Sequence, residues 1–301
     1  MIALPADIVL PLDKPSGPTS HDMVARIRRA LGTRRVGHTG TLDPFASGLL
    51  LLCVGRATRV AEYLSALDKT YEATVRLGRT TDTLDREGRV TSEPEGSTTL
   101  RRDEILDALE LFTGYIEQVP PQYSAKKVEG EAMHRRARRG EHVELEPRSV
   151  RIHEVTLLSM DLPLLELRVR CSSGTYIRSL ARDVGEVLGV GAHLAELRRT
   201  AIGAFHVAHA ISADALGDLA QVAAAALSPL AALGHMPSVE VGDEAVERLG
   251  QGRPIAVDLA HSGSAWTRGP DPAVVLARAG EIVAIAEARG GLLHPRKVFH
   301  R

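Results

Sequence analysis

Alternating hydrophobic and polar residues mark two segments of the chain, residues 71–77 and 165–171. The apolar positions are Tyr71, Ala73, Val75 and Leu77 in the first segment and Leu165, Leu167, Val169 and Cys171 in the second. A repeat of two is typical of a strand that is buried on one side. An uninterrupted apolar run at residues 8–12 predicts a short buried strand, and a second run covers residues 49–54.

Apolar residues spaced three or four positions apart predict three helices. They are Val24, Ile27 and Leu31 in the first helix, Ile105, Leu109 and Phe112 in the second, and Ile177, Leu180, Val184 and Leu188 in the third. Thr19 or Ser20 can cap the first helix, and Asp22 favours its first turn. Gly114 is expected to end the second helix.

The remaining pattern divides the chain into two predicted domains, residues 1–236 and 237–301. Strand-like pieces at 238–241, 273–277 and 282–286 are separated by glycine and proline turns, which predicts a small β-rich C-terminal domain. Residues 120–148 carry prolines near both ends and little apolar periodicity, as functional or mobile insertions do. Strands and helices together predict an α+β protein.

The overall charge hides local differences. Lysine and arginine total 37 and aspartate and glutamate 38 in 301 residues, a formal net charge of −1. This balance argues against a basic tail protein, but a nucleic acid responds to the local field. Three segments are basic. Residues 14–35 hold six lysines and arginines and one acidic residue, and residues 126–139 hold six lysines and arginines and two acidic residues. From Arg289 onward there are four lysines and arginines and no acidic residue.

Composition also limits compartment and cofactors. The two cysteines, Cys53 and Cys171, exclude a disulfide framework and favour a reducing compartment. We find no signal peptide, no apolar stretch long enough for a membrane span and no zinc-site spacing. A phosphate-binding loop and a dinucleotide fingerprint are missing too. We expect a cytoplasmic protein that binds no metal and no cofactor.

The densest candidate for chemistry is the loop at residues 35–48, with the sequence RVGHTGTLDPFASG. Its glycines permit unusual backbone angles, and Pro44 fixes the angle just after Asp43. A carboxylate on a rigid, solvent-facing loop suits a nucleophile or a general base. An Asp-Pro pair that only starts a turn explains the same residues, so both interpretations stay open on local chemistry.

Seven motifs in one order change that balance. They are LDKPSGPTS at 12–20, the 35–48 loop, KTY at 69–71, TDTLDREG at 81–88, QVPPQYSA at 118–125, SSGTYIR at 172–178 and GAHLAELRR at 191–199. Together they resemble the TruB family of tRNA pseudouridine synthases over about residues 8–205, and the tail resembles a PUA-type RNA-binding domain. The resemblance implies a pseudouridine synthase fold with a mixed, mostly antiparallel central sheet, an inserted thumb at about 120–148 and a small C-terminal β-barrel.

The resemblance also implies catalytic roles. Asp43 matches the family's nucleophilic aspartate, and Arg178 matches the arginine that would keep the Asp43 pKa low. Tyr71 matches the tyrosine that packs on the target base and handles its C5 proton. The residues alone leave simpler interpretations open. Arg178 would then be a solvated helix residue or a phosphate contact, and Tyr71 would be a tyrosine of the core.

Further positions would bind the substrate. Tyr176 and Leu197 match residues that sandwich the flipped base, and His38 matches a histidine that stacks in place of the extruded nucleotide. Lys14 belongs to the loop wall beside Asp43, where its role is either substrate contact or architecture. Each of Leu197 and His38 also has a purely structural interpretation. Leu197 would then be a core residue, and His38 would be a loop residue whose ring is hydrogen-bonded within the protein.

The substrate that the resemblance implies is the tRNA T-loop uridine conventionally numbered 55, with the thumb closing over the loop. The protein would act as a monomer without a protein partner. One alternative is a tRNA-folding chaperone, in which binding matters more than catalysis. Another is a hydrolase that uses Asp43 and Asp82 and releases free uracil. We instead assign Asp82 and Asp85 to structural bonds around the active-site loops.

Overall fold

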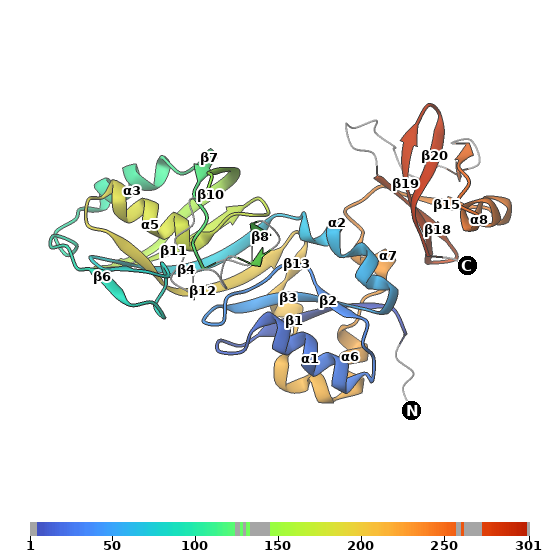
Figure 1. Cartoon of the computed structure of the whole chain (residues 1–301), viewed down its shortest axis with the longest axis horizontal. Helices are drawn as coiled ribbons and strands as arrows, with labels where there is room; N and C mark the ends of the chain where they lie inside the picture. Colours follow the sequence, from blue (N-terminus) through green and yellow to red (C-terminus); the bar gives the residue numbers. More distant parts are fainter. Residues whose placement is uncertain are drawn as a thin grey trace.

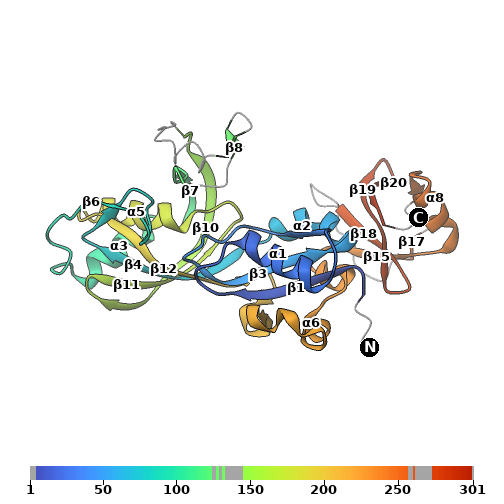
Figure 2. The ribbon, with the colours of Figure 1, turned by 60° about the horizontal axis from the view of Figure 1, so that its bottom comes forward.

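The computed structural model describes residues 5–123, 127–128, 131–132, 145–256, 260–261 and 273–299. Most of the predicted thumb therefore lies outside the described residues. The part that is described includes β8 (Lys127–Val128) and β9 (Glu131–Ala132), which pair antiparallel (Figure 2). No helix among the described residues is long and apolar enough to cross a membrane.

A mixed sheet forms the first part of the chain (Figure 1). Its described strands are β1 (Ile8–Lys14), β2 (Val36–His38), β3 (Ser47–Val54), β4 (Lys69–Leu77), β7 (Gly114–Gln118), β10 (Arg148–Asp161), β11 (Leu164–Cys171), β12 (Ala192–Ile202), β13 (Phe205–His206) and β14 (Ile211–Ser212). Eight follow the order β14-β1-β3-β12-β4-β11-β10-β7, while β2 pairs with β3 and β13 with β12. The pairs β1–β14 and β12–β3 are parallel and the others antiparallel. The predicted mixed, mostly antiparallel sheet is confirmed.

Helices cover this sheet at both ends (Figures 1 and 2). They are α1 (Ser20–Ala30), α2 (Ala61–Ser65), α3 (Arg102–Glu110), α5 (Ile177–Val187), α6 (Leu219–Ala225) and α7 (Pro229–Ala232), with short 3-10 turns at Gly55–Val60, Val207–His209 and Ala213–Gly217. The predicted start of α1 is confirmed, because Thr19 and Asp22 form a reciprocal capping box. A small hairpin, β5 (Thr80–Thr81) with β6 (Val90–Ser92), lies beside the main sheet.

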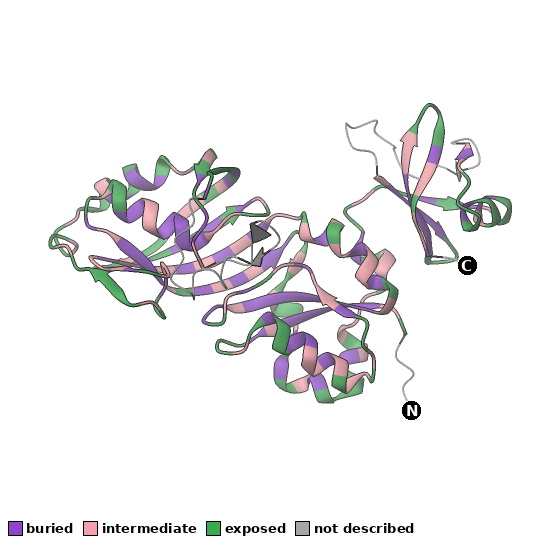
Figure 3. Cartoon of the chain, in the orientation of Figure 1, coloured by how far each residue is buried: buried purple, intermediate pink, exposed green. Residues whose placement is uncertain are grey.

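Buried residues follow the strands (Figure 3). One cluster joins alternate residues of β4, β11 and β12 to α3 and α5. The strands β1 and β3 bury both faces: Leu10 and Leu52 pack with α1, whereas Val9 and Leu51 pack toward α2 and α7. Burial on two faces explains why these strands are continuous apolar runs rather than alternating ones.

The C-terminal part forms a second, curled sheet that makes a half-barrel. Its described elements are β15 (Ser238–Val241), α8 (Asp243–Gly250), β16 (Ile255–Ala256), β17 (Ala260–His261), β18 (Ala273–Arg278), β19 (Glu281–Arg289) and β20 (Leu292–Val298). The half-barrel packs on α7 through Ile282 and Ile285, and Arg56 and Arg59 donate hydrogen bonds to the carbonyls of Phe299 and Val298. The domain boundary after residue 236 stays a prediction.

Gly48 stands where β3 pairs with β1 on one side and with β12 on the other. Its φ is +104°, and a Cβ there would lie 2.3 Å from the Arg199 carbonyl oxygen. We expect Gly48→Ala to cost about 1–3 kcal/mol for the backbone angle and about 1–3 kcal/mol more for the clash. Urea unfolding measures the loss.

A matched control separates the two causes. Gly17 has a φ of +107° but open space around its Cβ position, so Gly17→Ala carries only the cost of the angle. Equal losses of unfolding free energy in the two variants would contradict the close approach of Gly48 to β12.

Candidate active site

The Asp43 loop is held on both sides by side-chain hydrogen bonds to its backbone. It connects β2 to β3, and its neighbours Leu42 and Phe45 are buried in the core. The Ser20 hydroxyl accepts a hydrogen bond from the Leu42 amide at 2.9 Å and donates to the Leu42 carbonyl at 3.2 Å. Ser16 donates to the Phe45 carbonyl at 2.8 Å. The loop therefore presents Asp43 from a fixed backbone.

Lys14 supports the same loop through hydrogen bonds to backbone carbonyls. Its side chain is fully buried, and its ammonium donates to the carbonyls of Pro15, Pro18 and Pro44 at 2.9, 2.8 and 3.3 Å. Burial lowers the pKa of Lys14 to about 8, and the nearby Asp43 carboxylate partly opposes this. All three ammonium hydrogens are thus engaged by backbone carbonyls around the loop. The substrate contact of Lys14 stays a prediction.

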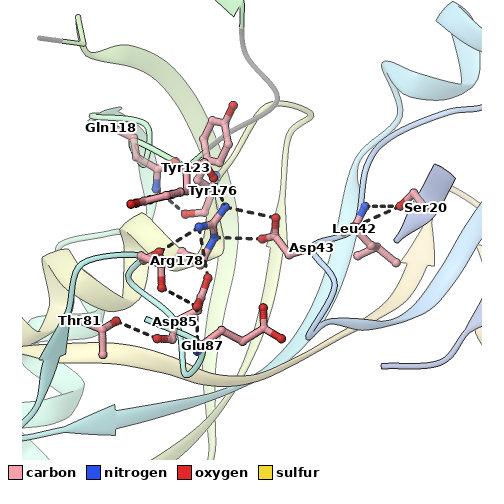
Figure 4. Close-up of polar contacts among 11 residues, drawn as sticks. Ser20, Leu42, Asp43, Thr81, Asp85, Glu87, Gln118, Tyr123, Tyr176 and Arg178 are labelled. Carbon is pink, nitrogen blue, oxygen red and sulfur yellow. Dashed lines mark hydrogen bonds and ion pairs between the residues drawn. The ribbon is translucent and has the colours of Figure 1, made fainter. Parts of the chain in front are cut away.

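Arg178, in the first turn of α5, holds the Asp43 carboxylate in a two-pronged ion pair (Figure 4). Nε lies 2.9 Å from Oδ2, and Nη2 donates to Oδ1 at 3.2 Å. The Arg178 side chain is 5% exposed, whereas the Asp43 side chain is 34% exposed. The pair thus joins a buried cation to a carboxylate that a substrate can reach.

The other Arg178 donors are anchored as well. Nη1 donates to the Thr83 carbonyl at 2.9 Å and to Asp85 Oδ2 at 3.3 Å, and Nη2 also donates to the Tyr123 carbonyl at 2.8 Å. Asp85 itself accepts from the Thr83 hydroxyl and the Glu87 amide. This network fixes the plane of the guanidinium and so the direction of Asp43 (Figure 4).

Tyr176 immediately precedes α5 and is positioned through its backbone. The Gln118 side chain accepts from the Tyr176 amide at 2.7 Å and donates to the Tyr176 carbonyl at 3.0 Å. Gln118 is buried at the end of β7, where the predicted thumb begins. Gln118 has no role predicted from the sequence, although it lies in one of the family motifs.

A cavity of about 350 Å³ opens beside Asp43. Its walls include four of the other predicted site residues, Tyr71, Tyr176, Arg178 and Leu197. Of the described residues that line it, only Asp43 is acidic. Tyr71 and Leu197 come from the adjacent strands β4 and β12. The structure therefore brings these five predicted residues together around one space.

His38 lies outside the residues that line the cavity. It is the last residue of β2, and its Nδ1 accepts a hydrogen bond from the Gly40 amide at 3.3 Å. Burial lowers the pKa of His38, and Arg199 adds to the effect. A neutral imidazole is the form that accepts this hydrogen bond.

Two buried cations of the cavity wall were not singled out from the sequence. Lys69 donates to the carbonyls of Ser65 and Leu67, and burial lowers its pKa to about 8. Arg199 lies two residues after Leu197 on β12, and therefore on the same face of the strand. That spacing was the available signal, since a charged residue on the inward face of a strand is unusual.

The remaining candidates do not extend the site. Asp82 is exposed, accepts from the Arg89 amide at 2.8 Å and is not among the residues lining the cavity. It is therefore poorly placed to serve as the second carboxylate of a hydrolase. Among the described residues, no group of three or more His, Cys, Asp or Glu is arranged to hold a metal ion.

The walls around Asp43 shift its titration. Desolvation raises the pKa of the carboxyl above its ordinary value, Arg178 opposes the rise and Asp85 adds to it. Because only the carboxylate can act as a nucleophile, we expect the single-turnover rate to fall with decreasing pH around a midpoint above 3.8, the ordinary value. Substrate binding measured at each pH is the control. A rate that stays constant down to pH 3.8 would contradict the desolvation of Asp43.

Comparisons with known proteins place the chain. Its sequence matches the TruB family pseudouridylate synthase (N terminal domain) over residues 28–177 and the tRNA pseudouridylate synthase B C-terminal domain over residues 178–233. A tRNA pseudouridine synthase B of Thermobifida fusca is 44% identical, covering 98% of this chain and 99% of the relative. That of Geobacter sulfurreducens is 40% identical, covering 93% of each.

Two solved structures are similar to this chain over most of its length. An H/ACA RNP bound to a substrate RNA containing 2′-deoxyuridine includes a chain with a TM-score of 0.74 and 29% identity, covering 98% of this chain and 85% of that one. A chain of a Cbf5-Nop10-Gar1 complex has a TM-score of 0.73 and 30% identity, covering 97% and 84%. The chain belongs to the TruB family of pseudouridylate synthases.

Proposed function

We propose that the protein converts the T-loop uridine conventionally numbered 55 of tRNA into pseudouridine, with Asp43 as the nucleophile. The observation that carries this proposal is the reachable Asp43 carboxylate, held by buried Arg178 at a cavity lined by two tyrosines and a leucine. The names of the curated relatives support tRNA as the substrate.

The reaction is an isomerisation. The bond between N1 of uracil and C1′ of ribose breaks, the base turns, and C5 bonds to C1′. C5 then loses its proton and N1 gains one, so that atoms and electrons balance without an oxidant, a reductant or a transferred group. For this reason we propose that the protein needs neither metal nor cofactor.

Asp43 would supply the covalent step. Its carboxylate adds either to the uracil ring or to ribose C1′, and each addition holds one fragment on the enzyme while the base turns. Arg178 would keep the carboxylate ionised and its oxygens directed toward the cavity, because both prongs of the ion pair are fixed by the surrounding network.

The cavity would receive the base outside the helical stack. A stacked base hides its N1 and C5 atoms from an enzyme, so the nucleotide must be extruded into a pocket. Tyr71, Tyr176 and Leu197 line the cavity and offer apolar faces on which a uracil ring can pack. We propose that His38, at the loop outside the cavity, stacks in the place that the extruded nucleotide leaves.

Exposed basic side chains at the end of α1 and just before β2 support RNA binding. Arg29, in the last turn of α1, and Arg34 and Arg35, just before β2, are exposed. The C-terminal basic segment is less available, because Glu287 pairs with both Arg289 and Arg296. We therefore propose that the tRNA phosphates lie mainly along α1 and the start of β2, with an affinity that falls steeply with salt.

Purified protein incubated with tRNA that carries tritium at C5 of uridine tests the proposal. The expected result is release of tritium to water, with pseudouridine as the nucleoside product. Tritium retained at every enzyme concentration would overturn catalysis and favour the chaperone alternative. Free uracil in place of the isomer would favour the hydrolase. Action as a monomer in the cytoplasm, without a protein partner, stays a prediction.

A further inference from the structure

Arg199 is a charged residue of the cavity wall that forms no ion pair with any described residue, and it is the most buried of these. It is 1% exposed. Nε donates to the Leu49 carbonyl at 2.7 Å and Nη2 to the Gly40 carbonyl at 3.1 Å. None of the ion pairs among the described residues includes it, whereas Arg198 next to it pairs with Asp13 and Arg178 with two carboxylates.

A buried charge without a counter-charge is costly, and this one is held in place rather than left loose. Its two carbonyl partners belong to β3 and to the loop before Asp43. A register shift between Arg199 and Ala201 marks a bulge in β12 at this point. Bulges redirect side chains near active sites, and this one occurs where Arg199 faces the cavity.

Tyr71 is the direct neighbour of Arg199 in the register of β12 and β4. Both side chains also line the cavity, and the charge and hydrogen-bonding capacity of the guanidinium act on the Tyr71 hydroxyl. The other titratable groups beside this hydroxyl are Asp43 of the loop and Cys171 of β11. Burial raises the pKa of Tyr71, and Arg199 is the one of these neighbours that lowers it.

We propose that Arg199 is the positioning residue for Tyr71, fixing the hydroxyl toward C5 of the base and stabilising the phenolate that removes the C5 proton. This inference rests on the proposed function. An arginine donor occupies one lone pair of the phenol oxygen and so restricts its rotation. The positive charge lowers the free energy of the phenolate in a site from which water is largely excluded.

Removal of the C5 proton by Tyr71 follows the formation of the new bond. Once C5 is bonded to C1′ it still carries its hydrogen, and C6 is doubly bonded to N1. The Tyr71 phenolate takes the C5 proton, and the C–H electron pair forms the C5=C6 double bond. The C6=N1 pair moves to N1, which takes a proton from water. Tyr71 returns its proton to water before the next turnover.

Four variants test this role: Arg199→Lys, Arg199→Met, Tyr71→Phe and the double variant Arg199→Met/Tyr71→Phe. Single-turnover rates are measured on tRNA with protium or deuterium at C5 of uridine. We expect Arg199→Met to slow pseudouridine formation roughly 10- to 100-fold, with an isotope effect larger than that of the wild type. Arg199→Lys keeps the charge and should recover part of the rate.

The pH profile and the double variant add readouts that a structural role would not change. Without Arg199 the phenolate forms at higher pH, so the alkaline rise of the rate should move upward. If Arg199 acts through Tyr71, the double variant should be no slower than Tyr71→Phe alone. Arg198→Lys, which keeps its surface pair with Asp13, is the matched control.

The outcomes separate this inference from the proposed function. A wild-type protein that forms no pseudouridine in tRNA would overturn the proposed function. An active wild type with additive losses in the double variant, and no change in isotope effect or pH profile, would overturn the role of Arg199 alone. Melting temperature and tRNA affinity of Arg199→Lys show whether a slow rate reflects damage to the fold.

Discussion

Asp43→Asn is expected to abolish pseudouridine formation while tRNA binding is largely retained. Asparagine has nearly the same shape as aspartate, so the loop anchored by Leu42 and Phe45 should keep its conformation. Its amide oxygen carries no formal charge and cannot replace the carboxylate as a nucleophile. A single-turnover assay at saturating enzyme measures the loss. A rate within about tenfold of the wild type, equal to about 1.4 kcal/mol, would contradict the assignment.

Asp82→Asn is the matched control for this experiment. Asp82 is also an aspartate of a family motif, but it is exposed and bonds to the Arg89 amide outside the cavity. We expect its rate to stay near that of the wild type. Equal losses in Asp43→Asn and Asp82→Asn would instead favour chemistry that uses both carboxylates.

Arg178→Met is expected to damage both activity and stability. The substitution leaves Asp85 buried without its cation, and breaking a buried pair costs about 3–5 kcal/mol. It also frees the Asp43 carboxylate from its two-pronged contact, and such misplacement can slow a reaction about 100-fold. Urea unfolding and the single-turnover rate measure the two effects.

The acid limb of the rate gives a third readout for this variant. Arg178 opposes the rise in the pKa of Asp43, so its loss should move the limb to higher pH. Arg182→Met, which changes a more exposed arginine of the same helix paired with its neighbour Asp183, is the control and should cost less than Arg178→Met. An Arg178→Met variant as stable and as active as this control would show that the network is dispensable.

Much of the fold could be predicted because local patterns and tertiary burial agree. The alternation at 71–77 corresponds to β4, and the apolar spacing from Val24 onward corresponds to α1 with its capping box at Thr19. The C-terminal pieces 238–241, 273–277 and 282–286 fall within β15, β18 and β19. The helix α1 and the strands β4 and β15 bury one face, and β18 and β19 bury both, so that in each case the apolar pattern records the burial.

Other elements escaped prediction where tertiary contacts override the local pattern. In β10, two register shifts against β11 break the alternation that would mark a strand. In β20, Pro295 suggests a break in the strand, because proline cannot donate a backbone hydrogen bond. It nevertheless pairs with Ala286 of β19, next to a register shift. On its other side β20 pairs with β16 only through Leu292 and Leu293, so Pro295 has no partner strand there among the described residues. Neither arrangement is visible from the residues of one strand alone.

The candidate site divides in the same way. Asp43, Tyr71, Arg178, Tyr176 and Leu197 were predicted from motifs, and the structure places them around one cavity. Their supports were not predicted, because they act through contacts between distant segments. Gln118 holds the Tyr176 backbone across 58 positions of the chain, and Arg199 bonds to the Leu49 carbonyl across 150. The burial of Lys14, whose ammonium donates to three backbone carbonyls, is likewise a property of the packing.

The central claim is that this cavity rearranges one T-loop uridine through Asp43. A T-arm transcript with tritium at a single uridine, the one conventionally numbered 55, tests it most directly. We predict that wild-type protein releases this tritium to water and leaves pseudouridine at that position, while Asp43→Asn binds the transcript and releases none. Tritium retained at this uridine but released from another, or released equally by Asp43→Asn, would contradict the account.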